Sequence, residues 1–300
     1  MSWSVAGRAA LAVAGAAVAT GVVTGLRRLT ERTGEPAARW ARENYRGRTV
    51  NLVGGPAVAT AAVLAAAAGA RQPRQVAVVL TAGVTAGAVG LYDDLVGGRP
   101  GQQAKGFRGH LGALRQGRLT SGMVKLGGVG AAGLVAAALL PVRSPGARPI
   151  SRPQAALSVA LGAGVVAGAA NLLNLLDLRP GRALKVAVVV GAPLAVSGQG
   201  GWLAAGPVGV AAAALPADLR ERIMLGDCGA NTLGALLGAA YVARAGLAGR
   251  ASALVLLAGL TAASEQVSFT RVIATTPVLR QLDEWGRGDG DPPPAVAPGN

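Results

Sequence analysis

Long apolar stretches, separated by short polar segments, constrain this chain more than any other feature of its sequence. They lie at about residues 4–26, 51–70, 75–92, 122–142, 155–176, 183–197, 201–216, 229–243 and 250–270. Most approach the roughly 20 residues that an α-helix needs to cross about 30 Å of hydrocarbon. Their Gly and Ala content suits close contact between helices in lipid. The sequence therefore predicts an all-α, polytopic membrane bundle of about nine transmembrane helices.

The composition excludes an intrinsically disordered chain and disfavours a water-soluble globule. Hydrophobic residues make up 51% of the chain, which is far more than an intrinsically disordered protein contains. Charged residues make up 14%, against roughly 25% in soluble domains. A water-soluble globule would need more polar surface than this. We therefore expect a multi-pass membrane protein that is surrounded by membrane lipids.

The distribution of charge predicts the orientation in the membrane. The chain has 29 Lys and Arg against 14 Asp and Glu, and the basic residues alternate with apolar stretches instead of forming the stripe that binds nucleic acid. Most of them fall in segments 27–50, 93–125, 177–185, 216–228 and 271–300. Because positive charge favours the inner face, these segments predict an outside N-terminus, an inside C-terminus and a cytoplasmic active face in a bacterial-type plasma membrane.

The domain organisation follows from the same pattern. Residues 1–270 are expected to form one transmembrane, catalytic-type domain. Residues 271–300 are expected to form a cytoplasmic tail that is Pro-rich and disordered after about residue 288. One cysteine, Cys228, and one histidine, His110, exclude an internal disulfide and a zinc site. A metal ion would need oxygen ligands.

Two acidic residues, Asp93 and Asp94, end the third apolar stretch. Adjacent carboxylates at the edge of a membrane repel each other, and Mg²⁺ or another cation would offset that cost. A solvated helix end is the alternative interpretation.

A second polar pattern places Asn171, Asn174 and Asp177 three residues apart. On a helix this spacing puts the three side chains on one slowly drifting stripe. Amide and carboxylate oxygens on one stripe suit a hard cation or a sugar hydroxyl, and hydrogen bonds between helices are the alternative.

A third motif, Gly226-Asp227-Cys228-Gly229, stands before the eighth apolar stretch. Its glycines allow a ligand to approach the backbone, and the following helix N-terminus offers N–H groups to a phosphate. A plain turn is the alternative. Lys125 lies close in depth to the Asp pair, where it would bind phosphate or balance charge, and Lys105 belongs to a neighbouring basic segment.

In their order along the chain, these motifs resemble those of the polyprenyl-phosphate N-acetylhexosamine-1-phosphate transferases (glycosyltransferase family 4). This membrane superfamily includes the phospho-N-acetylmuramoyl-pentapeptide transferases and the bacterial UDP-GlcNAc undecaprenyl-phosphate transferases. The resemblance covers roughly residues 44–240. It is carried by the pair Gly54-Gly55, the pair Asp93-Asp94, the NxxNxxD motif of Asn171, Asn174 and Asp177, and the GDxGxxxLG element of Gly226, Asp227, Gly229, Leu233 and Gly234.

The resemblance implies an Mg²⁺-dependent enzyme of cell-wall biogenesis. Such an enzyme transfers a sugar-1-phosphate from a UDP-sugar to polyprenyl phosphate and releases UMP. Two polyanions must meet, so charge neutralisation and alignment dominate the chemistry. The resemblance implies catalytic roles for Asp93, Asp94 and Asp177, metal-binding roles for Asp227 and Asp177, and substrate-binding roles for Asn171, Asn174, Lys105, Lys125 and Gly229. It is compatible with a homo-oligomer.

Two departures from the family pattern keep other functions open. Pro180 stands where many bacterial members have a second acid, and no histidine follows His110. Both features would suit a catalytically degenerate relative that acts as a membrane scaffold or binds the lipid carrier. A small transporter is a third possibility, but it would call for internal repeats and a mid-membrane ionisable residue, and neither is clear in this sequence.

Overall fold

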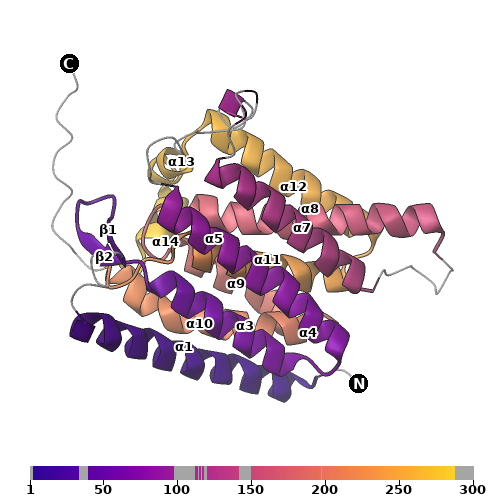
Figure 1. Cartoon of the computed structure of the whole chain (residues 1–300), viewed down its shortest axis with the longest axis horizontal. Coiled ribbons are helices and arrows are strands. Elements are labelled where there is room, and N and C mark those ends of the chain that lie inside the picture. Colours follow the sequence, from indigo (N-terminus) through magenta and orange to yellow (C-terminus); the bar gives the residue numbers. More distant parts are fainter. Residues whose placement is uncertain are drawn as a thin grey trace.

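The computed structural model describes residues 3–33, 40–97, 112–113, 115, 117, 120–141, 150–196 and 198–287, without the side chains of residues 26, 27 and 29–33. The chain is mostly helical, which confirms the predicted helical class (Figure 1). Each apolar stretch forms helix. The principal helices are α1 (Val5–Thr33), α3 (Gly54–Gly69), α4 (Pro73–Val79) continued by η1 (Leu80–Val84) and α5 (Thr85–Val96), α7 (Ser121–Leu139), α8 (Arg152–Leu176), α9 (Arg182–Val196), α10 (Gly201–Leu219), α11 (Gly226–Arg244) and α12 (Leu247–Gln266).

Several of these helices have the dimensions of membrane spans. Within the described residues, six are long and apolar enough to cross a bilayer, which supports a membrane-embedded protein. They are Val5–Gly25, Pro73–Val96, Ser121–Leu139, Arg152–Leu176, Gly201–Leu219 and Leu247–Gln266. The expected number of nine is not reached by this measure. α3 and α9 have 16 and 15 residues, and such short helices reach across a bilayer only with difficulty.

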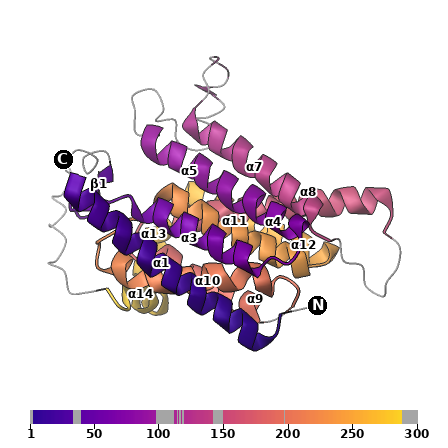
Figure 2. The same cartoon turned by 60° about the horizontal axis from the view of Figure 1, so that its bottom comes forward.

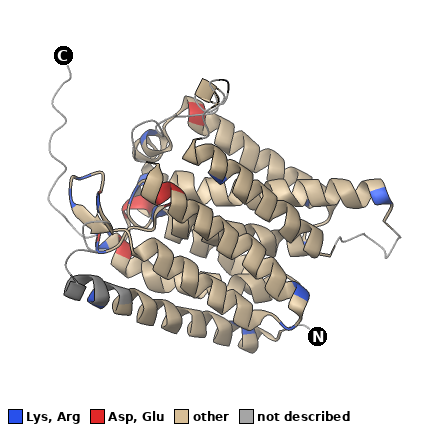
Figure 3. Cartoon of the chain, viewed as in Figure 1, with Lys and Arg blue, Asp and Glu red and all other residues tan. Residues whose placement is uncertain are grey.

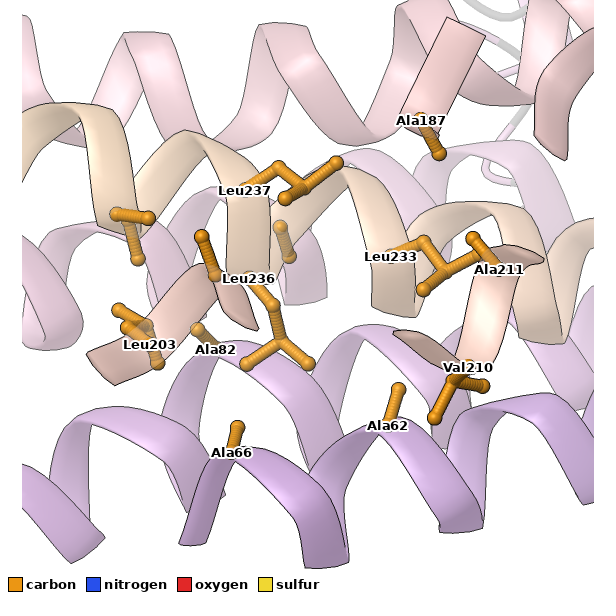
Figure 4. Packing of buried hydrophobic residues seen from close by; sticks show 14 of the residues in the cluster. Ala62, Ala66, Ala82, Ala187, Leu203, Val210, Ala211, Leu233, Leu236 and Leu237 are labelled. Carbon is orange, nitrogen blue, oxygen red and sulfur yellow. The ribbon is translucent and has the colours of Figure 1, made fainter. Parts of the chain in front are cut away.

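Helix α11 forms the centre of the bundle. It is buried along almost its whole length and packs against α3, α5, α8 and α10 (Figures 1 and 2). Alanines pack here against larger Leu and Val side chains (Figure 4), and glycines allow the closest approaches between helices. A Cβ added at Gly234 would lie 2.5 Å from Ala169 O of α8, and one at Gly206 would lie 2.6 Å from Ala65 Cβ of α3. Close approach of backbones is typical of helices in membranes.

Local capping fixes the start of two helices. Ser151 Oγ accepts the Gln154 N–H while Gln154 Oε1 accepts the Ser151 N–H, so a capping box starts α8. The Thr120 side chain accepts the Met123 N–H at 3.3 Å and starts α7. The start of α7 matters for the site because it sets the position of Lys125.

A short β-hairpin, which the sequence analysis did not predict, covers one end of the bundle. Strands β1 (Ala41–Glu43) and β2 (Thr49–Asn51) pair antiparallel with Arg42 opposite Val50. The hairpin is joined to the segment before α11, because the Met224 N–H donates to Asn51 O at 2.9 Å.

The expected C-terminal tail contains two further helices, α13 (Phe269–Thr275) and α14 (Pro277–Glu284). Arg182 at the start of α9 holds α14 by donating from Nε and Nη2 to the Asp283 carboxylate at 2.7 and 3.0 Å. Arg287 Nε also donates to Pro180 O at 3.0 Å. The tail is therefore packed against the bundle as far as residue 287, and the disorder expected after about residue 288 falls outside the described residues.

Candidate functional site

Three consecutive amides at the N-terminus of α11 are bound by two carboxylates from other helices. The N–H groups of Asp227 and Cys228 donate to the two carboxylate oxygens of Asp94, at the end of α5, both at 2.9 Å. The Gly226 N–H donates to Asp177, which follows α8. These carboxylates satisfy donors that a helix start leaves unpaired, and they complement its positive end. The amides expected to be open to a phosphate are therefore occupied in this arrangement.

Lys125 of α7 contacts two of the acids at this site. Its Nζ forms an ion pair with Asp227 Oδ2 and lies 3.8 Å from Asp93 Oδ2. Asn174 of α8 completes the group when its amide nitrogen faces Asp227. In that orientation Asn174 donates to Asp227 Oδ1 and accepts from Lys125 Nζ at 2.7 Å. We call the six residues the acid–lysine cluster: Asp93, Asp94, Lys125, Asn174, Asp177 and Asp227.

Glycines allow the helices to approach closely enough to build this cluster. Gly226 has a φ of +60°, and a Cβ there would lie 3.0 Å from both carboxylate oxygens of Asp94. A Cβ at Gly90 of α5 would overlap the Asp227 carbonyl. A Cβ at Gly55 of α3 would overlap Leu225 O in the same way. Glycine is thus required at these positions by backbone conformation or by backbone contact.

The cluster carries an excess of negative charge. Its four carboxylates and one ammonium sum to a formal charge of −4 + 1 = −3. Burial raises the pKa of Asp177 well above its usual range, and the negative charges of Asp218, Asp227 and Asp94 raise it further, while the Gly226 N–H opposes the rise. A cation that entered the cluster would relieve this repulsion.

The cation already present in the cluster is the Lys125 ammonium. Within the described residues, no group of three or more His, Cys, Asp and Glu side chains could hold a metal ion. Both oxygens of Asp94 accept amide protons, and Asp93 and Asp227 converge on Lys125. The expected Mg²⁺ ligands Asp177 and Asp227 therefore do not form such a group in this arrangement.

Other residues selected from the sequence lie elsewhere or outside the described part of the chain. Asn171 Nδ2 donates to Thr261 Oγ1 of α12 at 3.1 Å, which is the interhelical role that the sequence left open. Gly229 is buried, and a Cβ there would meet Leu225, so its surroundings are packed protein. Lys105 and His110 lie outside the described residues.

The structure adds charged residues that sequence motifs did not single out. Buried Asp218 accepts the Gly181 N–H at 2.6 Å, close to the α8 end of the site. Glu221 has a φ of +54° and pairs with Arg46 of the hairpin at 3.1 Å. Arg42 Nη2 donates to Asp94 O at 2.9 Å. In the sequence, these residues share with the motifs only their place in polar segments between apolar stretches. Figure 3 shows acidic residues gathered at this end of the bundle.

Two comparisons with known proteins identify no relative. A scan against models of protein families finds no match, and a search of curated proteins finds none either. The acid–lysine cluster and the motifs that build it are therefore the basis for a functional assignment.

Proposed function

We propose that this protein is a membrane phosphoglycosyltransferase that transfers a sugar-1-phosphate from a UDP-sugar to polyprenyl phosphate and releases UMP. The observation that carries the proposal is the convergence of Asp93, Asp94, Asp177 and Asp227 with Lys125. These residues come from four helices that lie far apart in the sequence. The four acids also belong to the motifs through which the sequence resembles the polyprenyl-phosphate sugar-1-phosphate transferases.

The proposed reaction needs charge control more than proton transfer. An oxygen of the lipid phosphate attacks the sugar-bearing phosphorus of the UDP-sugar and forms a new P–O–P bond. The bond between the two donor phosphates breaks, and its electron pair leaves with UMP. Because a phosphate monoester with a second pKa near 6 is mostly ionised at pH 7, the attacking oxygen hardly needs a general base.

Lys125 is the positively charged residue of the cluster, and its charge suits a phosphate group. Its ammonium is held between Asp93 and Asp227, and it would contact the phosphate of a bound substrate from this position. Asp94 would position the start of α11 through its two amide bonds. Asn174 would orient Lys125 and Asp227 through its amide. Each role is a positioning or electrostatic role.

The proposal also includes an Mg²⁺ ion, a membrane topology and a cellular location, each of which is inferred from the sequence. Asp177 and Asp227 would be the metal ligands by resemblance, and the formal −3 charge of the cluster supports a need for added cations. About nine transmembrane helices, with the N-terminus outside, would place the cluster at the cytoplasmic face of a bacterial-type plasma membrane.

UMP release tests the proposal. The full-length protein in detergent is mixed with Mg²⁺, undecaprenyl phosphate and each of a panel of UDP-sugars. We expect UMP release with at least one donor, loss of release with EDTA, and loss of release in Asp227→Asn. The matched control is Glu265→Gln, because Glu265 is an exposed acid of α12 outside the cluster. Equal activity of Asp227→Asn and wild type would overturn the assignment.

A catalytically degenerate, lipid-carrier-binding relative is the second function that a specific observation favours. The α11 amides and Lys125 are already paired with carboxylates, and the site lacks a group of metal ligands within the described residues. This alternative predicts binding of undecaprenyl phosphate that survives Asp227→Asn, with no UMP released from any donor.

A further inference from the structure

A cavity lies at the end of the bundle opposite the acid–lysine cluster. Helix α3 shows the separation, because Gly55 packs against Leu225 beside the cluster while Gly69 lines the cavity. These glycines are 14 residues apart, which is roughly 20 Å of α-helix. In Figure 3, basic residues are visible near the N-terminus, far from the gathered acids. The cavity has a volume of about 570 Å³, within the range of small-molecule sites.

Three arginines line this cavity, and no acidic residue is among the described residues that line it. They are Arg8, Arg71 and Arg74. Within the described part of the chain, none of the three forms an ion pair with a carboxylate. No anion among these described residues therefore neutralises their formal charge of +3.

Contacts with the described residues use only part of the hydrogen-bonding capacity of these arginines. Arg8 Nη1 donates to Gly198 O at 3.3 Å, and Arg74 Nη2 donates to Ala138 O at 3.4 Å, both long distances. Arg8 Nε is buried and has no hydrogen-bond partner among the described residues. The Arg71 guanidinium stacks 4.2 Å from the ring centre of Trp3, whose own Nε1 donates to Gly69 O at 2.8 Å.

The remaining wall of the cavity combines apolar and amide side chains. The lining includes the apolar residues Val78, Leu139, Leu140 and Trp202 as well as the amide side chains Gln72, Gln75 and Gln199. An inorganic anion would use the arginines and glutamines but not the apolar wall. A ligand with an anionic head and an apolar body would use both.

We propose that this cavity binds the phosphate head group of an amphiphile. Guanidinium groups match phosphate oxygens in charge and geometry, and Val78, Leu139 and Leu140 would contact the first apolar atoms beyond the head group. The helices that form the cavity end here, at the depth where lipid head groups lie if these helices span the membrane. The site does not depend on the reaction proposed for the acid–lysine cluster.

Isothermal titration calorimetry of the full-length protein in a neutral detergent tests the proposal. The probes are dihexanoyl phosphatidic acid, inorganic phosphate, and dihexanoyl phosphatidylcholine as a lipid without net charge. We expect saturable binding of phosphatidic acid, weaker binding at high salt, and at least a tenfold loss of affinity in the double variant Arg71→Gln/Arg74→Gln. The matched control Arg152→Gln removes an exposed arginine outside the cavity lining and is expected to bind like wild type.

The arms of the experiment separate the possible results. Binding of phosphatidic acid with little binding of inorganic phosphate or phosphatidylcholine would support an amphiphile site, whereas equal binding of phosphatidic acid and inorganic phosphate would overturn it and leave a site for phosphate alone. Equal affinity in the double variant and wild type, or no saturable binding of any phosphate probe, would overturn the proposal. If the double variant is unfolded, Arg71→Lys/Arg74→Lys serves in its place, because it keeps the positive charge but loses the planar guanidinium groups. It is expected to bind phosphatidic acid more weakly than wild type, and unchanged affinity or a complete loss of binding in that variant, when folded, would contradict the proposal.

Discussion

Replacing Gly90 by Ala should force apart the two helices that build the acid–lysine cluster. The added methyl carbon would overlap Asp227 O and would lie 2.6 Å from Asp227 C and 2.8 Å from Cys228 N. These are backbone atoms and cannot rotate away, so α5 and α11 must separate. Overpacking of this kind costs about 1–3 kcal/mol. At about 2–4 °C per kcal/mol, the scale of domains of 150–250 residues, the melting temperature should fall by about 2–12 °C.

The buried thiol of Cys228 provides the assay. Cys228 is the one cysteine of the chain and is 4% exposed, next to the α5 contact. A thiol-reactive fluorogenic dye would therefore report its exposure as the protein is heated in detergent. Gly127→Ala is the control, because a Cβ at Gly127 of α7 would meet nothing within 4 Å; its melting temperature should stay within about 2 °C of wild type. If both variants melted together, α5 and α11 would not be in contact at Gly90.

Two further predictions concern pH and the C-terminal helix. The pKa of Asp177 is raised in the folded state, so its ionisation destabilises the fold as pH increases. In EDTA, Asp177→Asn should therefore raise the melting temperature above neutral pH and leave it unchanged near pH 4. Equal melting temperatures of the variant and wild type at every pH would refute this. Burial opposes ionisation of Asp283, but hydrogen bonds from Arg182 and Arg287 outweigh it and lower its pKa. Its contribution should therefore be present above about pH 4 and disappear as pH falls below it. Asp283→Asn should accordingly speed proteolysis of the tail at pH 7 but not at pH 3, and equal protection of the tail in both proteins at pH 7 would count against the ion pair.

The sequence predicted those features that depend on local pattern. Long apolar stretches identified the helices, because a membrane span needs length and hydrophobicity more than any distant contact. Acids at the ends of several stretches predicted one charged face, and Asp94 and Asp227 do meet there. Lys125 was recognised from its depth near the start of a stretch, and it contacts these acids.

Features that depend on distant contacts could not be predicted in this way. Strands β1 and β2 have three residues each, with no alternating apolar pattern to indicate them. Arg182 and Asp283 are 101 residues apart, so no local signal showed that the tail would pack against α9. The hydrogen bond from the Asp227 N–H of α11 to Asp94 likewise joins residues that lie 133 positions apart in the sequence. Composition likewise did not separate full spans from shorter apolar helices such as α3.

A double-mutant cycle between Lys125 and Asp227 most directly tests whether separate helices converge on one charged centre. Both side chains are mostly buried, at 15% and 21% exposure, so removing either partner leaves the other charge poorly compensated. Unfolding free energies of wild type, Lys125→Met, Asp227→Asn and the double variant would be measured by detergent-induced unfolding. We predict that the double variant costs less than the sum of the single variants by about 1 kcal/mol or more. Additive effects within about 0.5 kcal/mol would contradict the convergence of α7 and α11 at this site.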